Sequence, residues 1–176
     1  MPDWSLRPAL ADDAAFLLRV YAATRANELA LTGWTPAQCD DFVRMQFSAQ
    51  DRDYRQRFPG ARFEVVELGG VPAGRLYVDA GDSEIRLLDI ALLPECRGRG
   101  IGTALLQGLL AEGRRRALAV SLHVETLNPA AALYRRLGFE VVEAQDFRQF
   151  MRWQPPAALT RQAEAAEAAD EAACCR

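Results

Sequence analysis

Hydrophobic and polar positions divide the chain into helix-like and strand-like stretches. Residues 5–10 form a short extended segment, and residues 12–30 follow the spacing of an amphipathic helix with acidic residues in its first turn. A second helix is expected over residues 36–57, because Thr35 and Gln38 stand three positions apart in the pattern of a capping box. The first third of the chain is therefore predicted to be helical.

Strand patterns take over in the middle of the chain. The segments "RFEVVEL" and "VPAGRLYVD" flank Gly69 and Gly70, which is a strong signal for a β-hairpin. Residues 84–93 form a third strand, apolar enough to be central in a sheet. A helix over residues 101–117 follows, with Ile101, Ala104, Leu105 and Leu109 along one face.

Residues 118–153 are predicted to form a strand, a helix and two further strands. Residues 118–125 are a strand, and "NPAAALYRRLGF" is a short helix with Asn128 as its cap and Gly138 just past its end. Residues 139–144 and 147–153 form a closing strand pair. The order predicts a mixed α/β fold with one crossover at its centre.

Length and composition fit one domain. The chain has 176 residues, half of them hydrophobic, and residues 1–153 are expected to fold together. Residues 154–176 begin with two prolines and become rich in Ala and Glu, so we expect a tail that is a marginal helix or disordered.

Charge and hydropathy exclude several classes of protein. The net charge of −3 argues against a nucleic-acid-binding role. All 21 basic residues are arginines. No apolar run reaches the length of a membrane helix, and no signal peptide is recognisable, so a cytoplasmic protein is expected. Four cysteines lack metal-site spacing and are expected to be free thiols: Cys39, Cys96, Cys174 and Cys175.

The segment "PECRGRGIGTALL" carries the first candidate chemistry. It places Gly98, Gly100 and Gly102 between a strand and a helix, with Arg97 and Arg99 among them. A helix N-terminus offers unpaired N–H groups and a positive dipole end, and glycines let a ligand approach the backbone closely. The segment therefore predicts a phosphate or pyrophosphate site.

The glycines have three other possible interpretations. A P-loop needs a lysine, which the chain lacks. A dinucleotide fingerprint needs a third Gly or Ala where Thr103 stands; Glu125 falls near the expected acidic offset, but hairpins rather than βαβ units precede the loop. The glycines could also form only a tight connection between strand and helix.

Two segments together resemble a known family. "LLDIALLPECRGRGIGTALL" is similar to the acetyl-CoA-binding motif of the GNAT superfamily of N-acetyltransferases, and "NPAAALYRRLGF" is similar to its second motif. The resemblance covers roughly residues 5–153. It implies a single-domain GNAT-like fold, in which a central mixed, largely antiparallel sheet contains a splayed parallel strand pair and is flanked by about four helices.

The resemblance also implies the cosubstrate and its contacts. Acetyl-CoA would be bound by backbone groups of the glycine loop and of the strand before it, and no metal is implied. Asn128 would contact the pantetheine arm or an ordered water, a role compatible with capping its helix. The implied cofactor-binding residues are Ile90, Ala91, Leu92, Arg97, Gly98, Arg99, Gly100, Ile101, Gly102, Thr103 and Asn128.

Two side chains are the candidates for proton transfer. Tyr134 occupies the family's tyrosine position and would act as general acid, since a phenol with a pKa of about 10 keeps its proton at neutral pH; it could instead be a packed core tyrosine. His123 is the only histidine and is the first candidate for the general base. Glu125, Asp89 or a water relay are the alternatives, and Asp89 could instead pair with Arg86 or cap a helix.

The acceptor is left open by the sequence. In this family the first two helices and a strand near the C-terminus shape the acceptor site, and the acids Asp40, Asp41, Asp51 and Asp53 could attract a cationic amine or simply be solvated. A small amine, an amino acid, a peptide N-terminus and a lysine all remain candidates, for a monomer or a homodimer. A non-catalytic CoA-binding module on the same fold is the alternative function. The aromatic and Met residues considered for this site are Trp34, Phe42, Met45, Phe47, Tyr54, Phe58, Phe147, Phe150 and Trp153.

Overall fold

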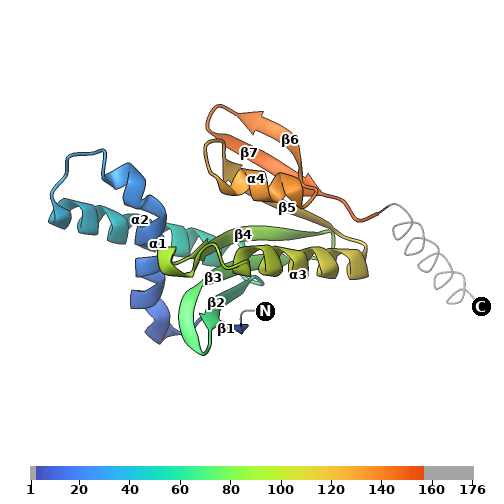
Figure 1. Cartoon of the computed structure of the whole chain (residues 1–176), viewed down its shortest axis with the longest axis horizontal. Helices are drawn as coiled ribbons and strands as arrows, with labels where there is room; N and C mark the ends of the chain where they lie inside the picture. Colours follow the sequence, from blue (N-terminus) through green and yellow to red (C-terminus); the bar gives the residue numbers. More distant parts are fainter. Residues whose placement is uncertain (1–2, 157–176) are drawn as a thin grey trace, which may run out of the picture. The chain divides into compact units, whose positions relative to one another are not determined.

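A computed structural model describes residues 3–156, which form two compact units (Figure 1). Among these residues, unit 1 takes 3–80 and 88–102, and unit 2 takes 81–87 and 103–156. Strand β4 (Glu84–Leu92) and helix α3 (Ile101–Arg116) each contribute residues to both units. No helix among the described residues is long and apolar enough to cross a membrane.

Unit 1 consists of two helices and antiparallel strands. Strands β1, β2 and β3 pair in sequence order, and the second half of β4 follows β3. Buried Val65, Val66, Leu76 and Val78 form part of its core. The elements before β4 are β1 (Trp4–Pro8), α1 (Ala14–Leu29), α2 (Pro36–Arg57), β2 (Arg62–Leu68) and β3 (Val71–Ala80).

Local signals in unit 1 fold as the sequence predicts. The Thr35 hydroxyl accepts from the Gln38 backbone N–H at 3.3 Å, and the Gln38 side chain accepts from the Thr35 N–H at 2.9 Å, which completes the capping box. Gly69 and Gly70 turn the β2–β3 hairpin with φ angles of 58° and 77°. Glycine adopts such angles without the steric cost that a Cβ would bring.

Unit 2 contains the crossover and the closing hairpin. Residues Glu84–Leu87 of β4 pair in parallel with Ala119–Leu122 of β5, and β5, β7 and β6 then lie side by side as antiparallel neighbours (Figure 1). Its other elements are α3, β5 (Ala119–Glu125), α4 (Ala130–Arg136), β6 (Glu140–Gln145) and β7 (Arg148–Trp153).

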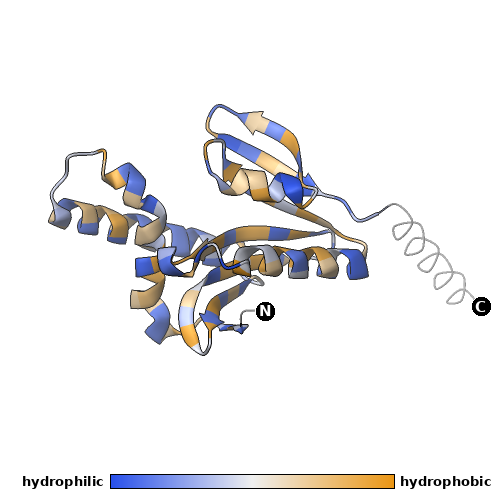
Figure 2. Ribbon diagram, in the orientation of Figure 1, coloured by the Kyte–Doolittle hydropathy of each residue, from blue (hydrophilic) through white to orange (hydrophobic). Residues whose placement is uncertain are grey.

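The period-two pattern of β5 sets the two faces of this sheet. Val120, Leu122 and Val124 are buried, whereas His123 and Glu125 are exposed on the opposite face. Apolar and polar residues alternate along the strands of unit 2 in Figure 2. The polar face of β5 is therefore available for chemistry, and the apolar face belongs to the core.

Most predicted elements are confirmed, with bounds that shift by one or two residues. The fold is α/β with four α-helices and a mixed sheet that contains the predicted parallel strand pair. A 3-10 turn over Ala11–Asp13 precedes α1, and Gly138 ends α4 with a φ of 91°. The tail predicted from residue 154 lies, from residue 157 onward, outside the described residues.

Candidate functional site

The glycine loop joins β4 to α3 through a short 3-10 turn, Pro94–Cys96. Gly98 and Gly100 have φ angles of 72° and 79°, a conformation that residues with a Cβ rarely adopt. A Cβ built at Gly98, Gly100 or Gly102 would meet no heavy atom within 4 Å. The loop thus presents open backbone at the start of a 16-residue helix, and its shape fits a phosphate-bearing ligand.

The two loop arginines differ in how they are held. The Arg97 Nε donates a hydrogen bond to the Leu92 carbonyl at 2.8 Å, which ties the loop back to the end of β4. Arg99 is exposed. Thr103, in the first turn of α3, is half-buried, and Ile101 is buried at 1% exposure.

The strand residues before the loop are fixed by close packing in unit 1. Ala91 is buried and lies so close to Gly74 that a Cβ there would stand 2.3 Å from the Ala91 carbonyl oxygen. The Leu93 N–H donates to the Ala73 carbonyl at 2.9 Å. Parallel pairing covers Glu84–Leu87 of β4, and the predicted pantetheine-binding residues 90–92 lie beyond that paired part.

Asp89 has a different partner from the one offered by the sequence. Arg75 on β3 donates two hydrogen bonds to the Asp89 carboxylate, at 2.8 and 3.1 Å, and a third to the Gln50 side chain at 3.0 Å. The suggested pairing with Arg86 is wrong, because Arg86 pairs with Glu84 instead. A carboxylate held in this way is a poor candidate for a general base.

Arg75 is a buried charge that sequence analysis did not single out. It is 1% exposed, and the rings of Tyr21 and Tyr77 lie 5.7 and 5.2 Å from its guanidinium carbon. Burial works against its charge, but Asp89, Tyr77 and Tyr54 together outweigh burial and raise the pKa of Arg75. The signal was a basic residue inside the otherwise apolar strand segment "AGRLYV", which needed a buried partner.

His123 lies in a row of side chains across three strands of unit 2. Phe150 on β7 is its register partner, and Glu143 on β6 is the partner of Phe150. The next row on the same face consists of Glu125, Arg148 and Gln145.

A β-bulge determines which residue of β6 faces this row. The register shifts between Val141 and Glu143, so that Val141 opposes Met151 while Glu143 opposes Phe150. Without the extra residue, Val142 would stand opposite Phe150. The bulge therefore places a carboxylate, rather than an apolar side chain, on the face that carries His123.

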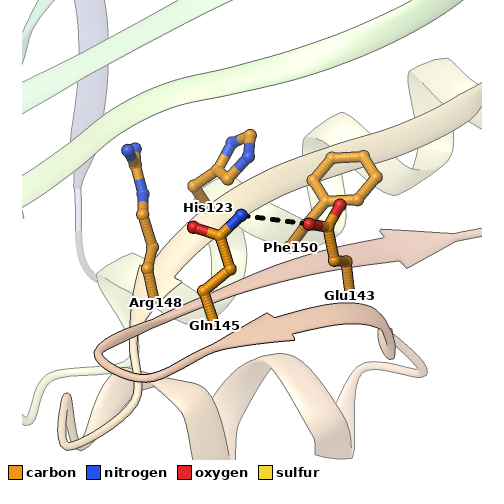
Figure 3. Close-up of a pocket in the computed structure, with 5 residues that line it drawn as sticks. All are labelled: His123, Glu143, Gln145, Arg148 and Phe150. Carbon is orange, nitrogen blue, oxygen red and sulfur yellow. Dashed lines mark hydrogen bonds between the residues drawn. The ribbon is translucent and has the colours of Figure 1, made fainter.

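These side chains surround a small pocket of about 100 Å³ (Figure 3). All five point to the same side of the sheet, and the Gln145 Nε2 donates to the Glu143 Oε1 at 3.1 Å. The His123 and Phe150 rings lie 4.9 Å apart. The lining residues are His123, Glu143, Gln145, Arg148 and Phe150.

The surroundings of His123 favour its neutral form. Partial burial lowers its pKa, and the positive charges of Arg148 and Arg86 lower it further, against a smaller opposite effect of Glu143 and Glu84. A neutral imidazole at neutral pH has a nitrogen that can accept a proton. Glu125, the alternative base, is exposed on the same face of β5, as its spacing predicts.

Tyr134 and Asn128 are positioned by the same short helix. Tyr134 is 6% exposed and packs edge-on against Phe139, with ring centroids 5.8 Å apart. The body of its ring is thus part of the core, as the alternative interpretation held. The Asn128 Oδ1 accepts from the Ala130 N–H at 2.9 Å, but α4 begins at Ala130, so its cap position is Pro129 and not Asn128 as predicted. The Asn128 bond closes a turn just before the helix.

The residues considered for the acceptor lie in different surroundings. Asp51 and Asp53 form ion pairs with Arg55 and Arg57 along α2, at 2.9 and 3.3 Å, which is typical of a solvated helix surface. Trp153 is buried and belongs to the core. The exposed members are Trp34, Met45 and Phe147, with 43%, 58% and 72% of their surface accessible.

Several pocket residues escaped the sequence analysis. Glu143 and Arg148 stand in the predicted closing strand pair, and Gln145 lies just beyond its first strand. The alternation of Glu143 and Gln145 with apolar residues was the available signal. The register that aligns them with His123 depends on the bulge and on the β5–β7 pairing, which no local pattern reveals. Within residues 3–156, no three His, Cys, Asp or Glu side chains come together as a metal site. Cys39 and Cys96 are free thiols, as predicted.

Comparison with known proteins identifies the family. The sequence model of the acetyltransferase (GNAT) family matches residues 27–139, which is more than half of the chain. The chain therefore belongs to the GNAT family of acetyltransferases, as the two sequence motifs predicted.

Curated relatives agree with this assignment. An uncharacterized N-acetyltransferase from Methanocaldococcus jannaschii is 32% identical over 134 residues, covering 62% of this chain and 59% of the relative. A mycothiol acetyltransferase from Saccharomonospora viridis is 43% identical over 78 residues, covering 43% of this chain and 22% of the relative. The chain thus matches between about a fifth and three fifths of the length of these curated relatives.

Solved structures show the same fold. The PaiA N-acetyltransferase from Thermoplasma acidophilum, in complex with coenzyme A, aligns with a TM-score of 0.66 and 16% identity, covering 86% of this chain and 99% of that one. YncA from Salmonella typhimurium, a putative acetyltransferase solved with acetyl-CoA, aligns with a TM-score of 0.54 and 22% identity, covering 88% and 95%.

Proposed function

We propose that this protein is an acetyl-CoA-dependent N-acetyltransferase that moves the acetyl group directly to a primary amine. The observation that carries the proposal is the glycine loop, where positive φ angles at Gly98 and Gly100 leave open backbone at the start of α3. Two structures of similar fold contain coenzyme A or acetyl-CoA, which supports the same cosubstrate here.

The proposal gives each group a role. Backbone N–H groups from Arg97 to Gly102 bind the pyrophosphate of CoA, helped by the charge of Arg99. The backbone of residues 90–92 holds the pantetheine arm, and an N–H near Leu92 stabilises the developing oxyanion. Asn128 contributes to the pantetheine side while its Oδ1 accepts from the Ala130 N–H.

Two side chains move protons during transfer. His123 takes a proton from the amine, because its lowered pKa keeps it neutral at physiological pH. Tyr134 gives its proton to the departing thiolate of CoA. No metal takes part in this scheme, and residues 1–153 carry the activity in a cytoplasmic monomer or homodimer.

Thermal unfolding with acetyl-CoA tests the cosubstrate. A ligand at 100 times its Kd stabilises a protein by about 2.7 kcal/mol, which is roughly 5–11 °C in Tm for a chain of this size. We expect such a shift with acetyl-CoA and none with NADH at the same concentration. A shift with NADH alone would favour a dinucleotide site, and no shift with either would leave the loop as a plain connection.

Turnover separates an enzyme from a binding module. Amine-dependent release of CoA thiol, followed with a thiol reagent, is expected for the enzyme. Binding of acetyl-CoA with no release for any class of amine would identify a non-catalytic CoA-binding module.

A further inference from the structure

The pocket beside His123 has an unusual combination of side chains for so small a space. A guanidinium, a carboxylate, a primary amide, an imidazole and a phenyl ring line it, all from β5, β6 and β7 (Figure 3). Every contact that defines the pocket lies within unit 2. The pocket is therefore formed by the β6–β7 hairpin and the neighbouring strand β5 alone.

Two of the charged side chains can still pair with a ligand. The Arg148 side chain is exposed and makes no hydrogen bond or ion pair with another side chain of the residues that the structure describes. Glu143 shares its Oε1 with Gln145 and leaves its Oε2 for another donor. A planar guanidinium pairs best with a carboxylate through two parallel hydrogen bonds, and a carboxylate pairs with an ammonium group.

We propose that the pocket lined by His123, Glu143 and Arg148 binds the head group of a zwitterionic α-amino acid. Arg148 pairs with the α-carboxylate, and Glu143 draws the α-ammonium toward His123. This inference rests on the proposed function, since it names the acceptor class of that acetyltransferase.

The size of the pocket supports a head group rather than a whole ligand. Its volume of about 100 Å³ is several times the ~10–15 Å³ of such space that one water molecule needs, which is room for a small polar group. An α-carboxylate and its amine fit that space, and the amino acid side chain extends along the half-buried ring of Phe150.

Charge separates this class from the competing acceptors. A polyamine has no carboxylate and would be repelled by Arg148. A peptide N-terminus or a lysine within a protein has no free carboxylate next to its amine. Only an acceptor with both charges on neighbouring atoms uses Arg148 and Glu143 at once.

The reaction balances with these groups. The bound ammonium gives one proton to His123, which passes it to water. The neutral nitrogen then forms a bond to the acetyl carbonyl carbon as the carbon–sulfur bond breaks. The second amine proton is lost to water, the departing thiolate takes a proton from Tyr134, and Tyr134 regains a proton from water, so the products are an N-acetyl amino acid, CoA and one net proton.

Matched acceptor pairs test the assignment. L-phenylalanine and phenethylamine differ only in the carboxylate, as do L-leucine and isoamylamine, and CoA release gives kcat/KM for each. Hydrogen bonds to charged groups contribute ~1.5–3 kcal/mol, so we expect each amino acid to exceed its amine by roughly 10- to 100-fold.

Variants assign the preference to the pocket. Arg148→Gln should raise KM for L-phenylalanine about tenfold or more and reduce the amino-acid preference to below about threefold. Arg136→Gln removes the same charge from an exposed position on α4 and should keep the preference. The Tm shift with acetyl-CoA should persist in both variants, which shows that they are folded.

A binding measurement separates this proposal from the proposed function. Titration calorimetry with L-phenylalanine, without acetyl-CoA, should show binding that Arg148→Gln weakens and Arg136→Gln does not. Acetyl transfer that favours the amines, or a preference untouched by Arg148→Gln, would overturn the pocket assignment and leave the acetyltransferase standing. Arg148-dependent binding with no CoA release would keep the pocket and overturn the proposed reaction, whereas neither binding nor transfer would overturn both.

Discussion

His123 is governed by the charges that share its face of the sheet. The positive charges of Arg148 and Arg86 disfavour protonation of the imidazole, and the negative charges of Glu143 and Glu84 partly offset this effect. Because burial and the arginines dominate, the pKa of His123 falls below the ordinary value of about 6.5. The imidazole is therefore neutral and able to accept a proton over a wider range of pH than a free histidine.

The pH profile of kcat/KM tests this residue. We expect an acid limb below pH 6.5, because protonation of His123 removes the base. Arg148→Gln removes a positive charge, so the pKa of His123 should rise and the limb should move to higher pH. His123→Ala should abolish the limb and lower kcat/KM roughly 100-fold; an unaltered profile in His123→Ala would remove this residue from the mechanism.

Tyr134 combines a structural ring with a proposed chemical role. Its ring packs on Phe139, and phenylalanine at position 134 would keep that packing. We expect Tyr134→Phe to lower kcat about 100-fold, since general acids typically contribute 10²–10⁴-fold. The Kd for CoA should stay within about threefold, and an unchanged kcat would show that another group protonates the thiolate.

The pair of buried Arg75 and half-buried Asp89 could be only partly predicted from the sequence. Asp89 is visible as an acid in an apolar strand, and sequence analysis correctly flagged it as requiring an explanation. The explanation is a pair with a residue 14 positions away, on the neighbouring strand. Choosing Arg75 over Arg86 required the register of β3 against β4, which is a tertiary property.

At the scale of elements, local chemistry was enough to predict much of the fold. The Thr35–Gln38 capping box and the Gly69–Gly70 turn each fix a boundary through contacts within a few residues, and the bond between Asn128 and the Ala130 N–H closes a turn just before α4. The β6 strand was also predicted, but its bulge at Val142 was not. A bulge depends on the partner strand, so that the side chains facing the pocket could not be assigned.

The glycine loop gives the clearest test of an element. Gly100 adopts a φ of 79° with open space around it, so Gly100→Glu adds strain, bulk and negative charge where the pyrophosphate is proposed to bind. We expect this variant to lose the Tm shift with acetyl-CoA. Gly108→Glu is the matched control, because Gly108 lies on α3 with no heavy atom within 4 Å of its Cβ position and without a positive φ.

Both outcomes of the loop test are informative. Loss in Gly100→Glu with retention in Gly108→Glu assigns cosubstrate binding to the loop. Equal CoA affinity in the two variants would contradict the pyrophosphate role of residues 97–102.

At the scale of the whole molecule, charge works against the proposed cosubstrate. The net charge is −3 and CoA is itself anionic, so attraction must come from local groups such as the loop arginines rather than from the protein's overall field. Composition excluded nucleic acid but gave no sign of this local arrangement. The function was indicated by the glycine-loop motif and not by the net charge of the chain.

Salt dependence distinguishes local from overall electrostatics. We expect the Kd for CoA to rise roughly threefold or more between about 50 and 500 mM NaCl, because contacts of exposed charges are screened. Arg99→Gln should weaken binding at low salt and flatten this dependence. Arg44→Gln, an exposed arginine on α2, should leave the slope as in the unmodified protein; equal slopes in all three would show that Arg99 does not contact the ligand.

The bulge at Val142 also affects which residues of the β6–β7 hairpin can change during evolution. It separates the tip of the β6–β7 hairpin, with Glu143, Gln145 and Arg148, from the base, where Met151 and Trp153 are fixed in the core. Because the tip residues are exposed or half-buried, their exchange leaves the packing at the base intact. The outer half of the hairpin can therefore change in sequence, by substitution or by a one-residue insertion or deletion at the bulge. Its inner half meanwhile keeps the packing that stabilises the sheet.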